Sequence, residues 1–289
     1  MIPAQFDYLA PTSLKEAVAM LAQHGDRAKL LAGGHSLIPA MKLRLSQPEL
    51  LVDLGRVKDL SFTNEKDGQV RIGAMTTHYQ IESSARLRSI CPLLPETASH
   101  IGDVQVRNKG TIGGSLAHAD PAADWPAAML ALGAELVATS TKGERVINAD
   151  SFFVDVMTTA LAPNEILSEI RVPVAPARSG YAYVKMAQPA SGFAVVGIAV
   201  ALTRDGAGKC SNVGIGVTGI APRAYRATAV ENALKGTTLD DATIARAAGH
   251  VADGIEPNAD LYASAEYRAH LGEVYAKRAI KRAVEAIRS

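Results

Sequence analysis

The sequence is poor in cysteine. Its 289 residues include only Cys91 and Cys210, which lie far apart and belong to no CxxC motif. Iron–sulfur clusters and structural zinc ions need several thiolate or histidine ligands at close spacing. The chain itself is therefore expected to hold no cluster and no metal ion. We expect both cysteines to be reduced, buried thiols, as is usual in a cytoplasmic protein.

The sequence also lacks an excess of charge and a long apolar run. Its net charge is +1, and its basic residues form no run, in contrast to the basic face of nucleic-acid-binding proteins. The longest apolar stretches, such as FAVVGIAVAL, are too short to span a bilayer. The first residues, MIPAQFDYLAP, lack the basic segment and apolar core of a secretory signal. We therefore expect a cytoplasmic protein.

Two common phosphate-binding signatures are missing as well. The sequence has no GxxxxGK[ST], so it has no P-loop. No GxGxxG follows a predicted strand, so a dinucleotide would not be held in the Rossmann manner. What the chain has instead is two glycine pairs, Gly33-Gly34 in LLAGGHSLIP and Gly113-Gly114 in GTIGGSLAHADPAADWP.

Both glycine pairs are predicted to form loops that lie against a ligand. Glycine has no Cβ and allows positive φ, so successive N–H groups can converge on an anion. Neighbouring hydroxyl groups can donate hydrogen bonds to phosphate oxygens. Two such motifs predict a ligand with a pyrophosphate, held from two sides. The candidate residues are Leu31, Ala32, Gly33, Gly34, His35, Ser36 and Leu37 in the first motif, and Thr111, Ile112, Gly113, Gly114 and Ser115 in the second.

The chain is long enough for two domains, and its patterns predict an α+β fold. Ser13-Leu14-Lys15-Glu16 is a capping box at the start of a helix that ends near Gly25. The segment 81–100 has a mostly helical pattern, broken at Cys91-Pro92, and the segment 125–132 is also helical. A short helix over 37–45 is expected after the first glycine motif.

The best domain boundary is the stretch VPVAPARSG, because prolines and glycine resist regular structure. We therefore predict a first domain over 1–173, a linker over 174–180 and a second domain over 181–289. Three antiparallel strands are expected at the start of the second domain. Helices over 225–234, 240–251 and 265–287 are expected to follow them.

The order of the motifs resembles a known family. LAGGHSLIPAMKLRLSQPELLVDLGRV, IGAMTTH and GTIGGSLAHADPAADWPAAMLALGAELV look like the FAD-binding medium subunit of molybdenum hydroxylases, the carbon monoxide dehydrogenase and xanthine dehydrogenase group. The resemblance implies a PCMH-type first domain, built of two α+β subdomains that hold FAD non-covalently. It also implies a smaller second domain that covers the flavin.

The resemblance implies further flavin contacts. Asp124 would contact FAD hydroxyl groups, and Asp120 is a weaker candidate; helix capping is the alternative role for Asp124. Lys185 would lie beside the flavin, where a cation stabilises the anionic reduced form. His35 is expected to form hydrogen bonds rather than to act in catalysis. The apolar positions expected to line the ring are Ile101, Leu167 and Phe193.

This sequence departs from many relatives at two of these positions. Phe193 stands where several relatives carry tyrosine. Phenylalanine keeps the stacking surface but has no hydroxyl group, which puts in doubt any polar contact at this position. Ser115 stands where many carry asparagine, and both side chains form hydrogen bonds.

The function implied is electron transfer, with the redox chemistry done by the flavin and no side chain assigned a catalytic role. The expected partners are a small subunit with two [2Fe–2S] clusters and a large subunit with the molybdenum cofactor, in a dimer of heterotrimers. Electrons would pass from the clusters to FAD and then to an external acceptor. A stand-alone FAD oxidoreductase and a non-catalytic assembly protein of the same fold stay as alternatives. The sequence identifies neither the substrate nor the acceptor.

Overall fold

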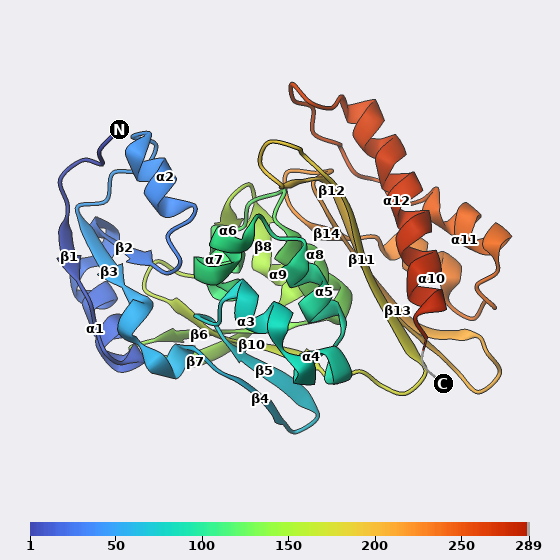
Figure 1. The fold of residues 1–289 in the computed structure, drawn as a ribbon, viewed down its shortest axis with the longest axis horizontal. Helices are drawn as coiled ribbons and strands as arrows, with labels where there is room; N and C mark the ends of the chain where they lie inside the picture. Colours follow the sequence, from blue (N-terminus) through green and yellow to red (C-terminus); the bar gives the residue numbers. More distant parts are fainter. Residues whose placement is uncertain (288–289) are drawn as a thin grey trace.

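A computed structural model describes residues 1–287, arranged around three main sheets (Figure 1). The first sheet is parallel and consists of β1 (Asp7–Leu9), β3 (Leu50–Asp53) and β2 (Ala28–Leu31), in that order. Helix α1 (Leu14–His24) buries three apolar residues at helical spacing. The Ser13 side chain caps its first turn and Gly25, with φ 54°, follows its end, as the sequence predicts. Three short 3-10 helices belong to this region: η1 (Gly25–Arg27), η2 (Leu54–Arg56) and η3 (Lys58–Leu60).

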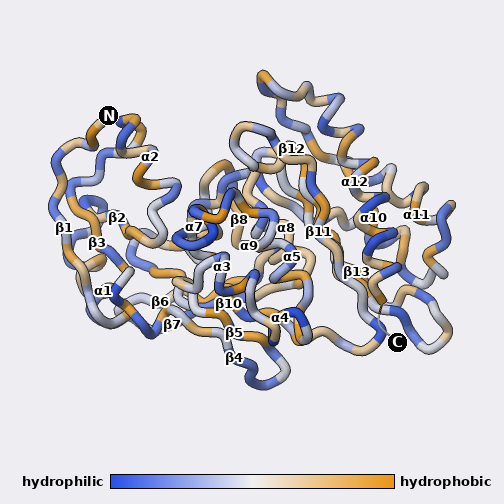
Figure 2. Tube along the Cα trace, in the orientation of Figure 1, coloured by the Kyte–Doolittle hydropathy of each residue, from blue (hydrophilic) through white to orange (hydrophobic). Residues whose placement is uncertain are grey.

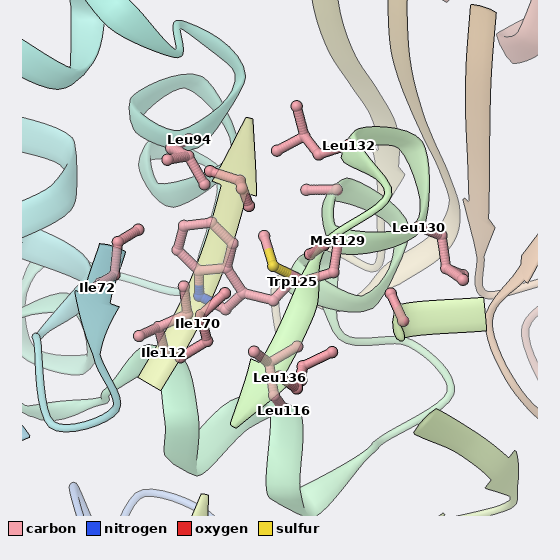
Figure 3. Packing of buried hydrophobic residues seen from close by; sticks show 14 of the residues in the cluster. Ile72, Leu94, Ile112, Leu116, Trp125, Met129, Leu130, Leu132, Leu136 and Ile170 are labelled. Carbon is pink, nitrogen blue, oxygen red and sulfur yellow. The ribbon is translucent and has the colours of Figure 1, made fainter. Parts of the chain in front are cut away.

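The second sheet is antiparallel and lies at the centre of the molecule. Its strand order is β4 (Thr63–Lys66), β5 (Gln69–Gly73), β10 (Ile166–Pro173), β6 (Glu135–Ser140) and β7 (Gly143–Asn148). Figure 3 shows the packing of Trp125 among Ile72, Leu94, Ile112 and Ile170, which come from strands of this sheet and from the helices that cover it. The larger core of the first domain therefore forms between this sheet and those helices. A second core forms around the first sheet and α1 and includes Val18, Leu21 and Val52.

Six helices lie between β5 and β6. They are α3 (His78–Ser83), α4 (Ala85–Ile90), α5 (Leu93–Ser99), α6 (Val104–Lys109), α7 (Ile112–His118) and α8 (Asp124–Leu132). The predicted break at Cys91-Pro92 is confirmed, since α4 ends at Ile90 and α5 begins at Leu93. A further break falls at Ser84, whose side chain caps α4. After β7 come α9 (Ala149–Phe152) and a small hairpin of β8 (Phe153–Asp155) and β9 (Thr158–Thr159).

The third sheet belongs to the C-terminal region and has four antiparallel strands rather than the three predicted. Its order is β11 (Ser179–Ala187), β12 (Ala194–Arg204), β13 (Cys210–Thr218) and β14 (Tyr225–Arg226). The prediction of a helix from Tyr225 is wrong at its start, because Tyr225 and Arg226 pair with Val217 and Gly216 on β13. Helices α10 (Thr228–Leu234), α11 (Asp241–Ala248) and α12 (Ala265–Glu285) follow.

The third sheet is covered on both faces (Figure 1). On one face, a Cβ added to Gly216 would lie 1.9 Å from the carbonyl oxygen of Ala127 in α8. On the other face, a Cβ added to Gly180 would lie 1.9 Å from the carbonyl oxygen of Ala283 in α12. Only glycine allows helix and strand backbones to approach so closely. The third sheet is thus fixed against α8, the helix that follows the second glycine motif.

The hydrophobic residues concentrate in the central strands and in α8, while the turns are hydrophilic (Figure 2). Cys91 and Cys210 are both buried and free, as predicted. Burial raises the pKa of the Cys91 thiol to about 12.

No helix among residues 1–287 combines the length and the apolar character needed to cross a membrane. Strand β10 ends at Pro173 and β11 begins at Ser179, so the irregular stretch covers 174–178, and the last two residues of the predicted linker, Ser179 and Gly180, lie in β11.

Candidate functional site

The first glycine motif lies between β2 and a short helix, α2 (Leu37–Lys42). Gly34 has φ +77°, a conformation that other residues rarely adopt. The N–H of Ile38 donates to the Gly34 carbonyl at 3.0 Å and closes the turn. Among the described residues, the main-chain N–H groups of residues 33–37 have no hydrogen-bond acceptor. Such a run of free main-chain donors is the arrangement that binds an anion.

Helix α2 ends earlier than predicted. The expected helix ran over 37–45, but Arg44 adopts a left-handed conformation with φ 63°. The residues after Lys42 therefore leave the helix.

The second glycine motif is helical, and the prediction of an open glycine loop is wrong there. Gly113 and Gly114 lie in the first turn of α7, whose N-cap is Thr111. The N–H of Gly114 donates to the Thr111 hydroxyl at 3.1 Å, and the N–H of Gly113 donates to the Ala74 carbonyl at 2.9 Å. A Cβ on Gly113 would lie 2.4 Å from the Cβ of Ala74. The glycine is needed for this contact within the protein rather than for positive φ.

The structure brings the two glycine motifs together. A Cβ on Gly33 would lie 2.3 Å from the carbonyl oxygen of Lys109 and 2.7 Å from the Cα of Gly110, just before α7. A Cβ on Gly114 would lie 3.3 Å from that of Ala32. The free donors of the first motif and the N-terminus of α7 therefore lie side by side. The free donors of the first motif favour a diphosphate group. The first N–H groups of α7 all have acceptors inside the protein, so α7 adds only the positive end of its dipole.

One residue that holds this junction was not singled out by the sequence analysis. His78 donates its main-chain N–H to the Gly110 carbonyl at 3.0 Å, and its buried Nδ1 accepts from the indole Nε1 of Trp125 at 3.0 Å. Burial, reinforced by the nearby His35 and Arg107, lowers the pKa of His78 from 6.5 to about 4. The imidazole is thus neutral at physiological pH, with its proton on Nε2. The sequence signal that could have identified His78 is its position at the end of IGAMTTH, one of the motifs that carry the family resemblance.

The predicted ring-lining residues occupy different environments. Leu167 is buried in the core on β10, and Ile101 is partly buried in the loop after α5. Phe193 is 41% exposed, in the turn between β11 and β12. His35, within the first motif, has an exposed side chain. Asp120 accepts from the N–H of Ala122 at 2.8 Å and so stabilises the turn before α8.

Asp124 and Lys185 form a buried ion pair across the two domains. The Lys185 ammonium lies 2.9 Å from Oδ1 of Asp124, and both side chains are about 5% exposed. Tyr183 on β11 donates its hydroxyl to the same carboxylate. Burial raises the pKa of Asp124, whereas Lys185 and the Tyr183 hydroxyl oppose that rise. The capping alternative for Asp124 does not hold, because Ala123 is the N-cap of α8.

A cavity of about 460 Å³ lies outside the glycine motifs, and neither Asp124 nor Lys185 lines it. Its walls come from the turn before α8, from the turn between β11 and β12, and from the loop before α12. The lining residues include Asp120, Gln188, Phe193, Asn258, Asp260 and Tyr262. None of the glycine-motif residues contributes to it.

Taken together, the fold and the glycine motifs define a protein whose two adjoining motifs suit a cofactor with a diphosphate group. Residues 4–175 match the family model described as "FAD binding domain in molybdopterin dehydrogenase", and residues 181–283 match "CO dehydrogenase flavoprotein C-terminal domain". The chain therefore belongs to the family of FAD-carrying medium subunits of molybdenum hydroxylases, and it is an oxidoreductase subunit with an FAD-binding domain.

Individual relatives match over the whole chain. The carbon monoxide dehydrogenase medium chain of Hydrogenophaga pseudoflava is 41% identical, with 98% of each chain covered. The alpha subunit of the 6-hydroxypseudooxynicotine dehydrogenase complex of Paenarthrobacter nicotinovorans is 38% identical, with 100% of this chain and 97% of that one covered. A solved structure of the Hydrogenophaga pseudoflava carbon monoxide dehydrogenase has a TM-score of 0.96 at 43% identity, with full coverage of both chains.

Proposed function

We propose that this chain transfers electrons from the [2Fe–2S] clusters of a small subunit, through its own FAD, to an external acceptor. The observation that carries the proposal is the run of free main-chain N–H groups over 33–37, adjoining the N-terminus of α7. When bound, FAD supplies the electron-accepting chemistry that no side chain of this chain provides. The first motif would bind the diphosphate of the cofactor, and the Thr111 and Ser115 hydroxyl groups would donate hydrogen bonds to it.

The remaining predicted residues belong to the same proposed site. Ile101, Leu167 and Phe193 would contact the flavin ring, with Phe193 supplying an aromatic face. Asp124 and Lys185 would act beside them, as a buried pair. Non-covalent attachment is part of the proposal, since His35 is proposed only as a hydrogen-bonding residue.

The partners proposed are a small iron–sulfur subunit and a large molybdenum subunit, in a dimer of heterotrimers and in the cytoplasm. The support is the full-length similarity to medium chains of multi-subunit enzymes. Relatives of comparable identity are named for carbon monoxide, 6-hydroxypseudooxynicotine and caffeine dehydrogenases. Since these substrates have little in common, we propose that substrate recognition lies in the large subunit, and we assign no substrate to this chain.

The subunit composition tests this proposal. A tagged copy of the chain, purified from its native cells, is expected to bring two further chains in equal amounts, together with flavin, iron and molybdenum. Mass measurement of the native assembly should correspond to two copies of each chain. A flavin-containing chain that purifies alone would favour a stand-alone oxidoreductase. A flavin-free chain would favour an assembly protein.

A further inference from the structure

The ammonium group of Lys185 has no hydrogen-bond donor left for a ligand. It donates to the His100 carbonyl at 2.6 Å, to the Gly192 carbonyl at 2.7 Å and to the Asp124 carboxylate at 3.1 Å. A lysine ammonium has three N–H donors, and three acceptors use all of them. The side chain is 4% exposed. A contact between this group and a cofactor would require one of the three bonds to break.

The charge of Lys185 is also largely balanced. The second carboxylate oxygen of Asp124, Oδ1, lies 2.9 Å from the ammonium nitrogen, whereas the 3.1 Å bond goes to Oδ2. The carboxylate is itself buried and accepts a hydrogen bond from the Tyr183 hydroxyl. Opposite charges at this distance in a buried site act as a dipole, so the field they project on a third group is weaker than that of a lone cation. Electrostatic stabilisation of a reduced flavin is therefore not the strongest role that this geometry supports.

The three acceptors come from three separate segments. His100 follows α5 and precedes Ile101, Gly192 precedes Phe193, and Asp124 begins α8. The backbones of the first two segments touch, since a Cβ on Gly192 would lie 3.6 Å from the Cα of Gly102.

The turn that holds Gly192 is compact. The N–H of Gly192 donates to the Gln188 carbonyl, and the N–H of Gln188 donates to the Phe193 carbonyl, both at 2.8 Å. One ammonium group thus ties this turn and the 100–102 loop to the head of α8.

We propose that Lys185 is a positioning residue, whose ammonium fixes the 100–102 loop and the 188–193 turn against Asp124 and thereby sets the spacing between Ile101 and Phe193. This inference rests on the proposed function, because it takes those two residues as the flavin-lining pair. It replaces a direct contact between Lys185 and the flavin by an action through main-chain carbonyls.

The decisive variants are Lys185→Arg and Lys185→Met, each in the protein purified with its partner chains. Arginine keeps the positive charge, but its planar guanidinium does not reproduce the three-way geometry of an ammonium. We expect both variants to release FAD at least 10-fold faster than the wild type, with arginine giving little rescue. Asp124→Asn should also make FAD release faster, and the double variant Asp124→Asn, Lys185→Met should release FAD little faster than Lys185→Met alone. The control is Glu231→Gln, which removes the charge of a buried carboxylate from its 2.7 Å ion pair with the half-buried Arg226, elsewhere in the same domain.

The flavin midpoint potential separates the two roles further. A direct electrostatic role would make Lys185→Met lower the potential and Asp124→Asn raise it, with Lys185→Arg close to the wild type and FAD release unchanged. That pattern would overturn the positioning role. The role would also be overturned if the Glu231→Gln control released FAD as fast as the Lys185 variants do. If Lys185→Met does not fold, Lys185→Arg and Asp124→Asn decide the question alone. A wild-type protein without FAD would instead contradict the proposed function.

Discussion

Gly33→Ala is expected to weaken FAD binding by about 10- to 100-fold. The added Cβ would lie 2.3 Å from the Lys109 carbonyl oxygen and 2.7 Å from the Cα of Gly110, and both are backbone atoms that cannot rotate away. The two glycine motifs would have to move apart to admit it. Forcing a methyl group into packed structure costs roughly 1–3 kcal/mol, and about 1.4 kcal/mol corresponds to a tenfold change in affinity. Equilibrium titration of the flavin-depleted protein with FAD measures the effect.

Gly206→Ala is the matched control. Gly206 lies in a turn of the C-terminal domain, where an added Cβ would meet only the far end of the Arg178 side chain at 3.6 Å. Its FAD affinity should equal that of the wild type. Melting temperatures of both variants show whether they are folded. Wild-type affinity in a folded Gly33→Ala protein would mean that the contact between the two motifs is not needed for the cofactor.

The second large effect expected is a loss of stability on acidification that depends on His78. Its pKa is near 6.5 in the unfolded chain and about 4 in the folded protein, so the unfolded chain binds more protons between these values. The contribution of the neutral His78 to the free energy of unfolding is therefore complete above about pH 6.5, and it is lost as the pH falls towards about 4. Linkage gives about 2 kcal/mol of this loss between about pH 7 and about pH 5. Urea unfolding, followed by the emission of the single tryptophan Trp125, measures it.

His78→Gln should remove this pH dependence, so its stability should change less than that of the wild type between the same two pH values. His270→Gln, at an exposed position on α12, should behave as the wild type. If His78→Gln and the wild type lose the same free energy of unfolding on acidification, the imidazole is not held neutral by its burial against Trp125.

Much of the fold could be predicted because its signals are local. The Ser13 cap and the spacing of Ala17, Val18 and Leu21 predicted α1, and the prolines after Val172 indicated where regular structure stops. The two glycine motifs were found in the same way. Their meeting depends on a close contact between Gly33 and the backbone before α7, which no local pattern contains.

The errors have the same origin. Glycine is a poor helix former, so Gly113-Gly114 predicts a loop. In the structure both residues lie in the first turn of α7, where Gly113 packs against Ala74 and Gly114 donates to the Thr111 hydroxyl. The pairing of Asp124 with Lys185, across 61 residues of sequence, was not predicted, and their contacts with the flavin stay predictions. Their mutual bond depends on how the third sheet docks on α8. Strand β14 was missed because two residues carry no detectable alternation.

The most direct test of the central claim is the flavin content of the wild-type protein, purified with its accompanying chains and precipitated with acid. A site built from the two glycine motifs without a covalent bond predicts that the supernatant is yellow, that the released compound has the mass of FAD, and that its amount equals that of this chain. Colour that stays in the pellet, release of FMN alone, or a colourless protein would contradict the account.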